Sequence, residues 1–390
     1  MPPVTLISSM RNWLLPENIE DILPPEAQRI EALRARLLEL YRVHGYRLVM
    51  PPLLEYLESL LTGTGEDLDL RTFKFVDQLS GRMMGIRADI TPQVARIDAH
   101  LLNQNGITRL CYCGSILHTQ LRTQTATREP LQIGAEIFGH AGIESDLEIQ
   151  SLLLKSLTIC GVKDARLDIG HVAIFRSLCK GSGMPHTLEV DLYSALDAKD
   201  NPKLEILTKD LETNTRDALR QLPSLYGDRS ILRDAEKVLP DYPEIRSALS
   251  DLDRLSRDPE FPVSIDLADL RGYNYHTGIV FSAYVPGQPN AVALGGRYDE
   301  VGEAFGRARP ASGFSIDLRE MARIGSVTME QGAILAPCSD DENLSFVIEE
   351  LRNNHEVVIR DLSGNGQLGD ESGCDRELAL LEGKWQVIMR

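Results

Sequence analysis

The chain has 390 residues, of which 43% are hydrophobic and 25% are charged, and its 41 basic and 58 acidic side chains give a net charge of −17. This length allows two or three domains with a substantial core. Because nucleic-acid partners are normally held by a basic surface, the charge counts against nucleic acid, although a local basic patch is compatible with an acidic total. An acidic surface that only keeps the protein soluble explains the charge equally well.

The six cysteines are spread through the chain without a Cys-x-x-Cys pair, at Cys111, Cys113, Cys160, Cys179, Cys338 and Cys374. This spacing favours free thiols in a reducing compartment and predicts no metal site. No apolar run is long enough to cross a bilayer, and the apolar stretch Val4–Met10 lacks the basic start of a signal peptide. We therefore expect a soluble, cytoplasmic protein without a metal or a cofactor.

The predicted elements begin with a helix that Pro24-Pro25-Glu26 opens and Gly45 ends, because proline suits the first turn and glycine the end of a helix. A second helix is expected from Thr91-Pro92, a cap followed by a first-turn proline, to His100. The other elements expected before residue 175 are a helix from Ser145-Asp146 and strands at Arg47–Met50, Thr72–Val76, Arg82–Arg87, Leu110–Leu117, Leu131–Phe138 and Ala165–Ile169.

From about Arg176 to Arg257 the pattern is helical, and the expected helices are Leu204–Leu222, Ile231–Leu239 and Ile245–Leu255. The chain then returns to strands and one helix, at Val263–Asp266, Ile279–Val285, Val292–Leu294 and Leu318–Ile324. The tail is expected to hold a strand–helix–strand unit, a short helix and a last strand, with the named parts at Ala333–Leu335, Leu344–Asn353, Val357–Arg360 and Gln386–Met389. Strands in runs, with helices to one side, predict an α+β fold.

One predicted strand carries a polar pair on a single face. Side chains four positions apart in a strand point the same way, so Gln132 and Glu136 share a face with Gly134 and Phe138. A glutamine and a carboxylate that flank a glycine predict the floor of a pocket for a small polar cation. The residues alone leave open the alternative of a strand with one solvated face.

Four segments, in this order along the chain, resemble motifs of the class II histidyl-tRNA synthetases. Ile86–Thr91 resembles the loop that holds the substrate α-amino group, and Arg109–His118 with the residues after it resembles motif 2. Leu270–Gly278 and Leu294–Asp299 resemble the two histidine-specific motifs. The resemblance covers about residues 15 to 324, which is nearly the whole predicted fold.

This resemblance implies the antiparallel sheet of class II synthetases flanked by helices. It implies a discontinuous core over residues 1–175 and 258–328, a helical insertion over residues 176–257, and a shortened α/β domain over residues 329–390 that corresponds to part of an anticodon-binding domain. The first predicted helix and the strand after it resemble motif 1, which implies a homodimer.

The resemblance also implies a histidine-binding pocket. Asp89 and Thr91 take the positions that hold the α-amino group, and Arg271 takes that of the arginine that stabilises charge during activation. Tyr275 matches the first of two pocket tyrosines, and His276 replaces the second. The residues expected in the pocket are Asp89, Thr91, Gln132, Glu136, Arg271, Tyr275 and His276.

The nucleotide half of the synthetase site departs from the family pattern. His118 stands where motif 2 has the arginine that grips the α-phosphate, Gln120 replaces the ATP-positioning glutamate, and Glu320 stands at the motif 3 arginine. The loop after motif 2 holds only two basic residues, Arg122 and Arg128. Because adenylation depends on fixed cations aimed at the phosphates, we expect this chain not to catalyse it.

A histidine pocket without ATP chemistry resembles the regulatory subunits of ATP phosphoribosyltransferase, a family of synthetase paralogues without catalytic activity of their own. The resemblance implies a complex with the short-form catalytic subunit for the first step of histidine biosynthesis, with histidine as a feedback effector. The alternatives are a working histidyl-tRNA synthetase and a free-standing amino-acid- or tRNA-binding module. A membrane is not expected among the partners.

Overall fold

The structure, a computed structural model, describes residues 13–63, 66–121, 126–258, 261–326, 332–362 and 373–390. The chain separates into two compact units, Met1–Val327 and Thr328–Arg390. Among the described residues, no helix is both long enough and apolar enough to cross a membrane.

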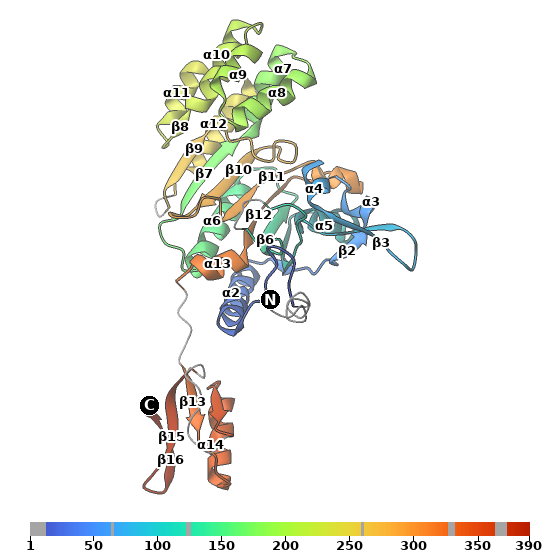
Figure 1. Ribbon diagram of the computed structural model, residues 1–390. Helices are drawn as coiled ribbons and strands as arrows, with labels where there is room; N and C mark the ends of the chain where they lie inside the picture. Colours follow the sequence, from blue (N-terminus) through green and yellow to red (C-terminus); the bar gives the residue numbers. More distant parts are fainter. Residues whose placement is uncertain (1–12, 64–65, 122–125, 259–260, 327–331, 363–372) are drawn as a thin grey trace, which may run out of the picture. The chain divides into compact units, whose positions relative to one another are not determined.

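Within the described part of the first unit, a nine-stranded sheet has the order β1-β5-β6-β12-β11-β10-β7-β9-β8 (Figure 1). Neighbouring strands are antiparallel except in the parallel pairs β1–β5 and β7–β9. A small antiparallel sheet has the order β2-β4-β3. The strands are β1 (Arg47–Leu48), β2 (Leu54–Tyr56), β3 (Phe73–Val76), β4 (Met83–Ile86), β5 (Thr108–Ser115), β6 (Leu131–Phe138), β7 (Arg166–His171), β8 (Tyr226–Gly227), β9 (Val263–Asp266), β10 (Ile279–Tyr284), β11 (Ala293–Arg297) and β12 (Ala311–Asp317).

The helices of this unit form two groups. The first group contains α2 (Pro24–Val43), α3 (Leu57–Leu60), α4 (Glu66–Arg71), α5 (Thr91–Arg96) with its π-helical continuation η1 (Ile97–Leu102), α6 (Ile143–Ile159), η3 (Val301–Phe305) and α13 (Leu318–Ile324). The second group, the helical segment (residues 172–255), lies between β7 and β9 in the chain and contains α7 (Val172–Ser182), α8 (His186–Asp197), α9 (Asn201–Leu207), α10 (Thr213–Gln221), η2 (Leu222–Ser224), α11 (Ile231–Val238) and α12 (Pro243–Leu255).

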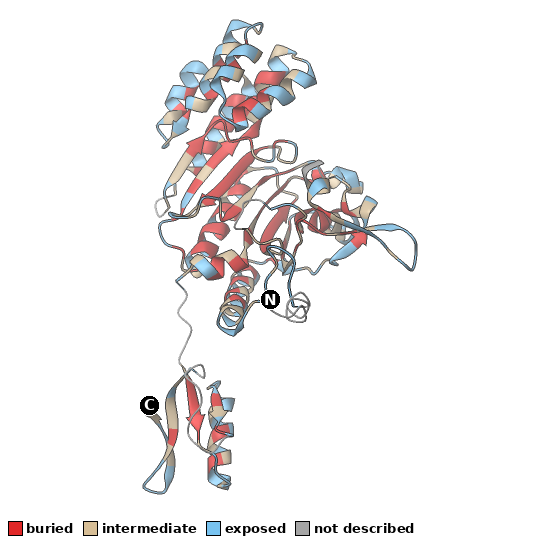
Figure 2. Cartoon of the chain, viewed as in Figure 1, coloured by how far each residue is buried: buried red, intermediate tan, exposed pale blue. Residues whose placement is uncertain are grey.

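The main core lies where α2, α6 and α13 pack on one face of the nine-stranded sheet. In α2 the buried residues Ile30, Leu33, Leu37 and Tyr41 recur every three or four positions and form one apolar stripe. The predicted helix is thus confirmed, and its stripe anchors it to the sheet. Figure 2 shows the same division in the helical segment, whose buried residues face inward and whose outer faces are exposed.

Strand alternation separates the two faces of the sheet at β6. Ile133, Ala135 and Ile137 point into the main core, whereas Gln132 and Glu136 point to the opposite face, as the sequence predicts. A second and smaller apolar cluster lies on that opposite face, against α5 and η3. Its buried members are Ile90, Val94, Ala95, Leu110, Tyr112, Ile116, Phe138, Tyr298, Val301 and Ala311.

The structure corrects the predicted helices at two places in this unit. The helix expected over Leu204–Leu222 is two helices, because the Glu212 side chain accepts hydrogen bonds from Asn214 N and Thr215 N and starts α10 anew. Thr91 does not cap α5 but lies in its first turn, where its N–H donates to Asp89 Oδ1 at 2.9 Å.

Several elements of this unit were not predicted, among them α7, α8 and β12. Strand β12 has the sequence Ala-Ser-Gly-Phe-Ser-Ile-Asp, whose glycine and serines lower its strand propensity. It is a strand because it pairs with β11 on one side and β6 on the other. Tertiary pairing therefore overrides the local preference of this segment.

The second unit has a four-stranded sheet of order β14-β13-β15-β16, with α14 packed on one face. Its elements are β13 (Ala333–Ala336), α14 (Glu342–Asn353), β14 (Val358–Arg360), β15 (Cys374–Leu381) and β16 (Lys384–Met389). The short helix expected before the last strand is wrong for the described residues, since residues 374–381 form β15 between β13 and β16. Residues 363–372 lie outside the described part of the chain.

A buried ion pair attaches α6 to the sheet of the first unit. Asp146 Oδ2 on α6 lies 2.6 Å from Arg297 Nη2 at the end of β11, and this nitrogen also donates to Ser145 Oγ at 2.8 Å and the Gly142 carbonyl at 3.0 Å. Both partners are buried. Removing one partner of a buried pair leaves an uncompensated charge, so this contact is costly to break.

We therefore expect Arg297→Met to lower the free energy of unfolding by about 3–5 kcal/mol. The matched control is Arg254→Met, which removes an exposed arginine 2.9 Å from Glu144 and should cost about 0–1 kcal/mol. Urea unfolding of both variants measures the difference. Equal and small losses in the two variants would contradict the structural role of Arg297.

Candidate functional site

Gln132 holds the loop before α5 against the sheet. Its side-chain Oε1 accepts the Ile90 N–H at 2.9 Å, and its Nε2 donates to Asp89 Oδ1, also at 2.9 Å. The same Asp89 oxygen accepts the Thr91 N–H. One amide side chain thus fixes Asp89 and Thr91 beside β6, so three of the residues predicted to share a pocket lie together.

Glu136 is the centre of this cluster. It is 1% exposed, and its Oε1 accepts hydrogen bonds from Thr91 Oγ1 and the Tyr112 hydroxyl, both at 3.1 Å. The Tyr298 hydroxyl donates to the other carboxylate oxygen. Burial raises the pKa of the Glu136 carboxyl to about 8, although the hydrogen bond from Tyr298 acts in the opposite direction.

Two glycines make room for this arrangement. Gly313 of β12 pairs with Glu136, and a Cβ atom at position 313 would lie 1.4 Å from Glu136 Oε2. Gly134 of β6 pairs with Tyr112, and a Cβ atom there would lie 2.5 Å from the Tyr112 hydroxyl. Glu136 therefore fits over the sheet because residue 313 has no side chain, and Tyr112 fits because residue 134 has none.

Tyr275 approaches the cluster from the loop before β10. Its ring lies 5.0 Å from that of Tyr298, and burial, together with the charges of Glu136 and Asp89, raises the pKa of its hydroxyl. Within the described residues, this buried hydroxyl has no hydrogen-bond partner. The site thus contains one buried hydroxyl that the charge of Glu136 influences and that has no hydrogen-bond partner among the described residues.

The two other predicted pocket residues, Arg271 and His276, have no hydrogen bond to Glu136 among the described contacts. Arg271 forms an ion pair with Asp269, donating from Nε to Oδ1 at 2.8 Å, and also donates to the Tyr284 hydroxyl. His276 packs its ring edge against Tyr275, and burial lowers its pKa to about 4, so the ring is neutral. The Arg271 guanidinium therefore contacts Asp269 and Tyr284.

The nucleotide half of the site has its polar groups engaged within the protein. His118 is buried, and its Nε2 lies 2.7 Å from Arg71 Nη2 and 2.9 Å from the Ala88 carbonyl oxygen. Arg319, the residue before Glu320, donates to the carbonyls of Glu129 and Glu20 at 2.7 and 3.2 Å.

The remaining residues of this half differ in exposure. Gln120 is exposed, and Glu320 is half-buried in the first turn of α13, where Asp317 accepts the Arg319 N–H and caps the helix. Arg128 lies over the Phe73 ring. Arg122 lies outside the described residues. The described cations Arg71, Arg128 and Arg319 thus all have partners within the protein.

The sequence motifs did not predict two residues of this cluster, Tyr112 and Tyr298. Tyr298 lies in the second histidine-specific segment directly after Arg297, and its hydroxyl reaches Glu136. Tyr112 follows Leu110 with strand period two on β5 and so shares the face of Glu136. That alternation was the available signal for Tyr112.

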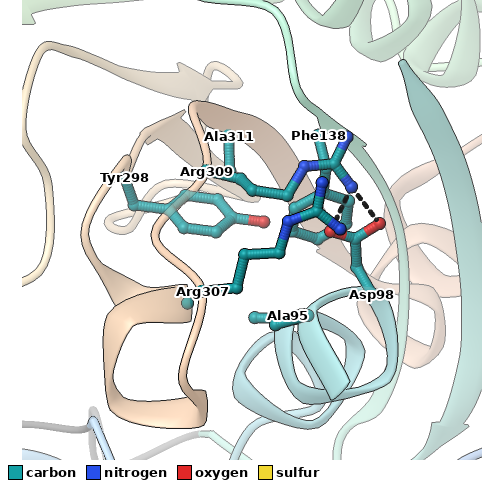
Figure 3. Close-up of a pocket in the computed structure, with 9 residues that line it drawn as sticks. Ala95, Asp98, Phe138, Tyr298, Arg307, Arg309 and Ala311 are labelled. Atoms are coloured by element: carbon teal, nitrogen blue, oxygen red, sulfur yellow. Dashed lines mark hydrogen bonds and ion pairs between the residues drawn. The ribbon is translucent and has the colours of Figure 1, made fainter. Parts of the chain in front are cut away.

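A second buried ion pair, between Arg309 and Asp98, lines a small pocket together with Tyr298. Figure 3 shows the Tyr298 ring at the wall of a small pocket, close to Asp98 and Arg309, and the pocket has room for about one water molecule. Arg309 Nη1 lies 2.8 and 2.7 Å from the two Asp98 carboxylate oxygens. This pair joins η1 to the start of β12, and the pocket is too small for an amino acid.

The raised pKa of Glu136 predicts a pH-dependent stability. The folded protein holds the Glu136 proton up to pH of about 8, whereas an unfolded glutamate loses it near its ordinary value of 4.5. Stability is therefore lost as the pH rises through this window. A glutamine at this position cannot ionise, so the free energy of unfolding of Glu136→Gln should rise relative to that of the parent as the pH goes from 5 to 8. We expect this relative increase to be about 1 kcal/mol or more, or about 2–4 °C in Tm.

Calorimetric melting of the parent and the variant at several pH values between 5 and 8 measures this difference. The control is Glu144→Gln, because the hydrogen bond from Arg254 lowers the pKa of Glu144 and places its titration below the window. A Tm difference between Glu136→Gln and the parent that does not change with pH would show that the Glu136 carboxyl is ionised throughout.

Comparisons with known proteins agree with this architecture. The family model for histidyl-tRNA synthetase matches residues 18–321, and the model for the ATP phosphoribosyltransferase subunit HisZ C-terminal domain matches residues 331–388. Among solved structures, one described as an ATP phosphoribosyltransferase regulatory subunit/histidyl-tRNA synthetase from Bacillus halodurans has a TM-score of 0.80 at 25% identity, over 91% of this chain and 94% of that chain. A histidyl-tRNA synthetase from Nostoc sp. PCC 7120 has a TM-score of 0.77 at 19% identity over 97% of both chains, which shows a shared fold.

Two curated relatives are described as ATP phosphoribosyltransferase regulatory subunit, from Burkholderia cenocepacia and Ralstonia pickettii, and each is 58% identical to this chain. The matches extend over 382 and 380 residues, which are 98% and 97% of this chain and 100% and 98% of those proteins. The chain therefore belongs to the family of ATP phosphoribosyltransferase regulatory subunits, and its larger unit has the histidyl-tRNA synthetase fold.

Proposed function

We propose that this chain is the non-catalytic subunit that acts with a short-form catalytic subunit as ATP phosphoribosyltransferase, in the first step of histidine biosynthesis, and that it makes the complex responsive to histidine. The names of relatives that match over the whole chain support this function, as does the C-terminal family model. In this proposal the catalytic subunit supplies all of the chemistry.

The observation that carries the effector role is the buried Glu136 carboxyl with its hydroxyl neighbours. A carboxyl whose pKa is raised by burial ionises readily when a cationic group arrives, and the resulting charge-assisted hydrogen bond is strong. The α-amino group of histidine is such a group, and its imidazole is one when protonated. The Tyr275 hydroxyl, which has no hydrogen-bond partner among the described residues, adds a further hydrogen-bonding group, and its ring contacts Tyr298.

The proposed pocket consists of Asp89, Thr91, Gln132, Glu136 and Tyr275, with His276 behind Tyr275. Arg271 belongs to it only if its guanidinium leaves Asp269 when the ligand binds. Histidine would regulate the complex by binding one of its two states more tightly than the other.

The absence of adenylation is part of the same proposal. Adenylate formation needs cations directed at the α- and γ-phosphates. His118 is hydrogen-bonded inside the fold, and Arg319 is 3% exposed and donates to two backbone carbonyls. These contacts argue against a working histidyl-tRNA synthetase, although the fold is shared with that enzyme.

The decisive experiment measures ATP phosphoribosyltransferase activity of the short catalytic subunit, with and without this chain, while histidine is titrated. We expect activity that depends on this chain and falls as histidine rises. Glu136→Ala should support activity but raise the half-inhibitory histidine concentration roughly 10-fold or more, because it removes a buried charged partner. The matched control, Glu236→Ala, removes an exposed carboxylate of α11 and should leave inhibition unchanged.

Activity that does not depend on this chain would refute the proposed function. Unchanged inhibition in Glu136→Ala would instead refute the pocket and move the effector site elsewhere in the complex. ATP–pyrophosphate exchange by this chain with histidine would revive the synthetase alternative.

We also propose that the first unit forms a homodimer through β1 and the residues after it. Strand β1 is an edge of the nine-stranded sheet, paired only with β5 among the described residues. The adjoining side chains of Leu48, Met50, Leu53 and Leu54 are between 40% and 77% exposed. An edge strand beside contiguous exposed apolar residues is typical of an interface.

We expect Met50→Asp to shift this chain from dimer toward monomer, because a carboxylate in an apolar interface loses its hydration. Val238→Asp, which changes an exposed valine of the helical segment, should leave the mass unchanged. Sedimentation velocity measures both variants. A dimer of undiminished stability in Met50→Asp would place the interface elsewhere.

The proposed setting is the cytoplasm. All six cysteines are free, which fits a reducing compartment. The net charge of −17 argues against nucleic acid as a partner.

A further inference from the structure

The loop over residues 270–278 is compact, and two of its tyrosines reach different elements. Its turn is closed by hydrogen bonds from Tyr275 N and His276 N to the Gly272 carbonyl, both 2.7 Å long. Gly272 has a φ of +67°, and a Cβ atom there would lie 2.7 Å from the His276 ring, so the turn requires glycine. Tyr275 packs on Tyr298 at the candidate pocket, whereas Tyr273 packs on the helical segment.

Tyr273 is held by both α7 and α8. Its ring meets Phe175 of α7 edge-on at 5.2 Å and stacks on Tyr193 of α8 at 5.4 Å, with an angle of 24° between the rings. Arg176 of α7 lies over the same ring and donates to the Tyr273 carbonyl at 2.8 Å. The Tyr273 hydroxyl donates to Glu189 of α8.

The opposite end of the loop is also tied to α7. Val172, the first residue of α7, donates its N–H to the carbonyl of Gly278 at 3.0 Å. The loop is thus clamped to the start of the helical segment at Tyr273 and at Gly278. On the pocket side, Tyr275 and Tyr298 form a continuous path of contact to Glu136.

We infer that the loop over residues 270–278 couples the occupancy of the candidate pocket to helices α7 and α8, with Tyr273 as the positioning residue. This inference rests on the proposed function, because the occupant is the histidine effector. A ligand that engages Tyr275 restrains the loop, and the packed ring of Tyr273 passes that restraint to α8. By linkage, a variant that frees α8 from the loop also weakens histidine binding.

Hydrogen exchange of the full-length chain, with and without saturating histidine, tests the coupling. In the parent we expect histidine to slow the exchange of the α8 amides, residues 186–197, by about threefold or more. Tyr273→Ala should lose this protection and weaken the histidine affinity, measured by calorimetry, roughly 5-fold or more. Tyr273→Phe keeps the ring contacts and should retain both properties.

Two further variants serve as an independent test and as a control. Tyr193→Ala removes the stacked ring from the α8 side and should also lose the protection, which keeps the test valid if Tyr273→Ala does not fold. Val190→Ala changes an exposed residue of α8 that is 48% accessible, and it should behave as the parent.

The outcomes separate the two proposals. If the parent binds histidine but α8 exchanges equally fast with and without it, the coupling is refuted while the histidine pocket stands. Protection of α8 that persists in Tyr273→Ala would show a merely structural role for Tyr273 and also refute the inference. If the parent binds no histidine, the effector role itself fails and the coupling fails with it.

Discussion

The buried carboxyl of Glu136 is the constraint on which the candidate site depends. A carboxyl without solvent must either be hydrogen-bonded or hold its proton, and Glu136 does both, with hydroxyl donors from Thr91, Tyr112 and Tyr298 and a pKa of about 8. The donors come from three separate parts of the chain. The arrangement therefore forms only when α5, β5 and the segment after β11 are all in place.

Two glycines of the nine-stranded sheet leave room for the Glu136 side chain and its partner Tyr112. Gly134 and Gly313 flank the carboxylate on β6 and β12, and side chains at either position would occupy the space of Tyr112 or Glu136. A glycine inside a strand weakens that strand, so its presence at both positions has a structural cost. The cost is local, because each strand is paired on both sides within the nine-stranded sheet.

The residues predicted for the histidine pocket and those predicted for the nucleotide site differ in their contacts. In the candidate pocket, hydroxyl groups converge on Glu136, and the Tyr275 hydroxyl has no hydrogen-bond partner among the described residues. Near the predicted nucleotide site, Arg319 donates to the carbonyls of Glu129 and Glu20. Asp317 has taken a structural role as well, because it caps α13 where the family motif has a glycine.

The sequence by itself determined the α+β class, the apolar stripe of α2 and the face shared by Gln132 and Glu136, because each follows from local periodicity or residue pattern. It did not reveal β12, the partners of Arg271 or the hydroxyl shell of Glu136. Tertiary structure decided these, because they depend on contacts between distant residues: Tyr298 is 162 positions from Glu136. The hydrogen-bond partners of a buried carboxyl come from segments that are distant in sequence, so a local sequence pattern does not predict them.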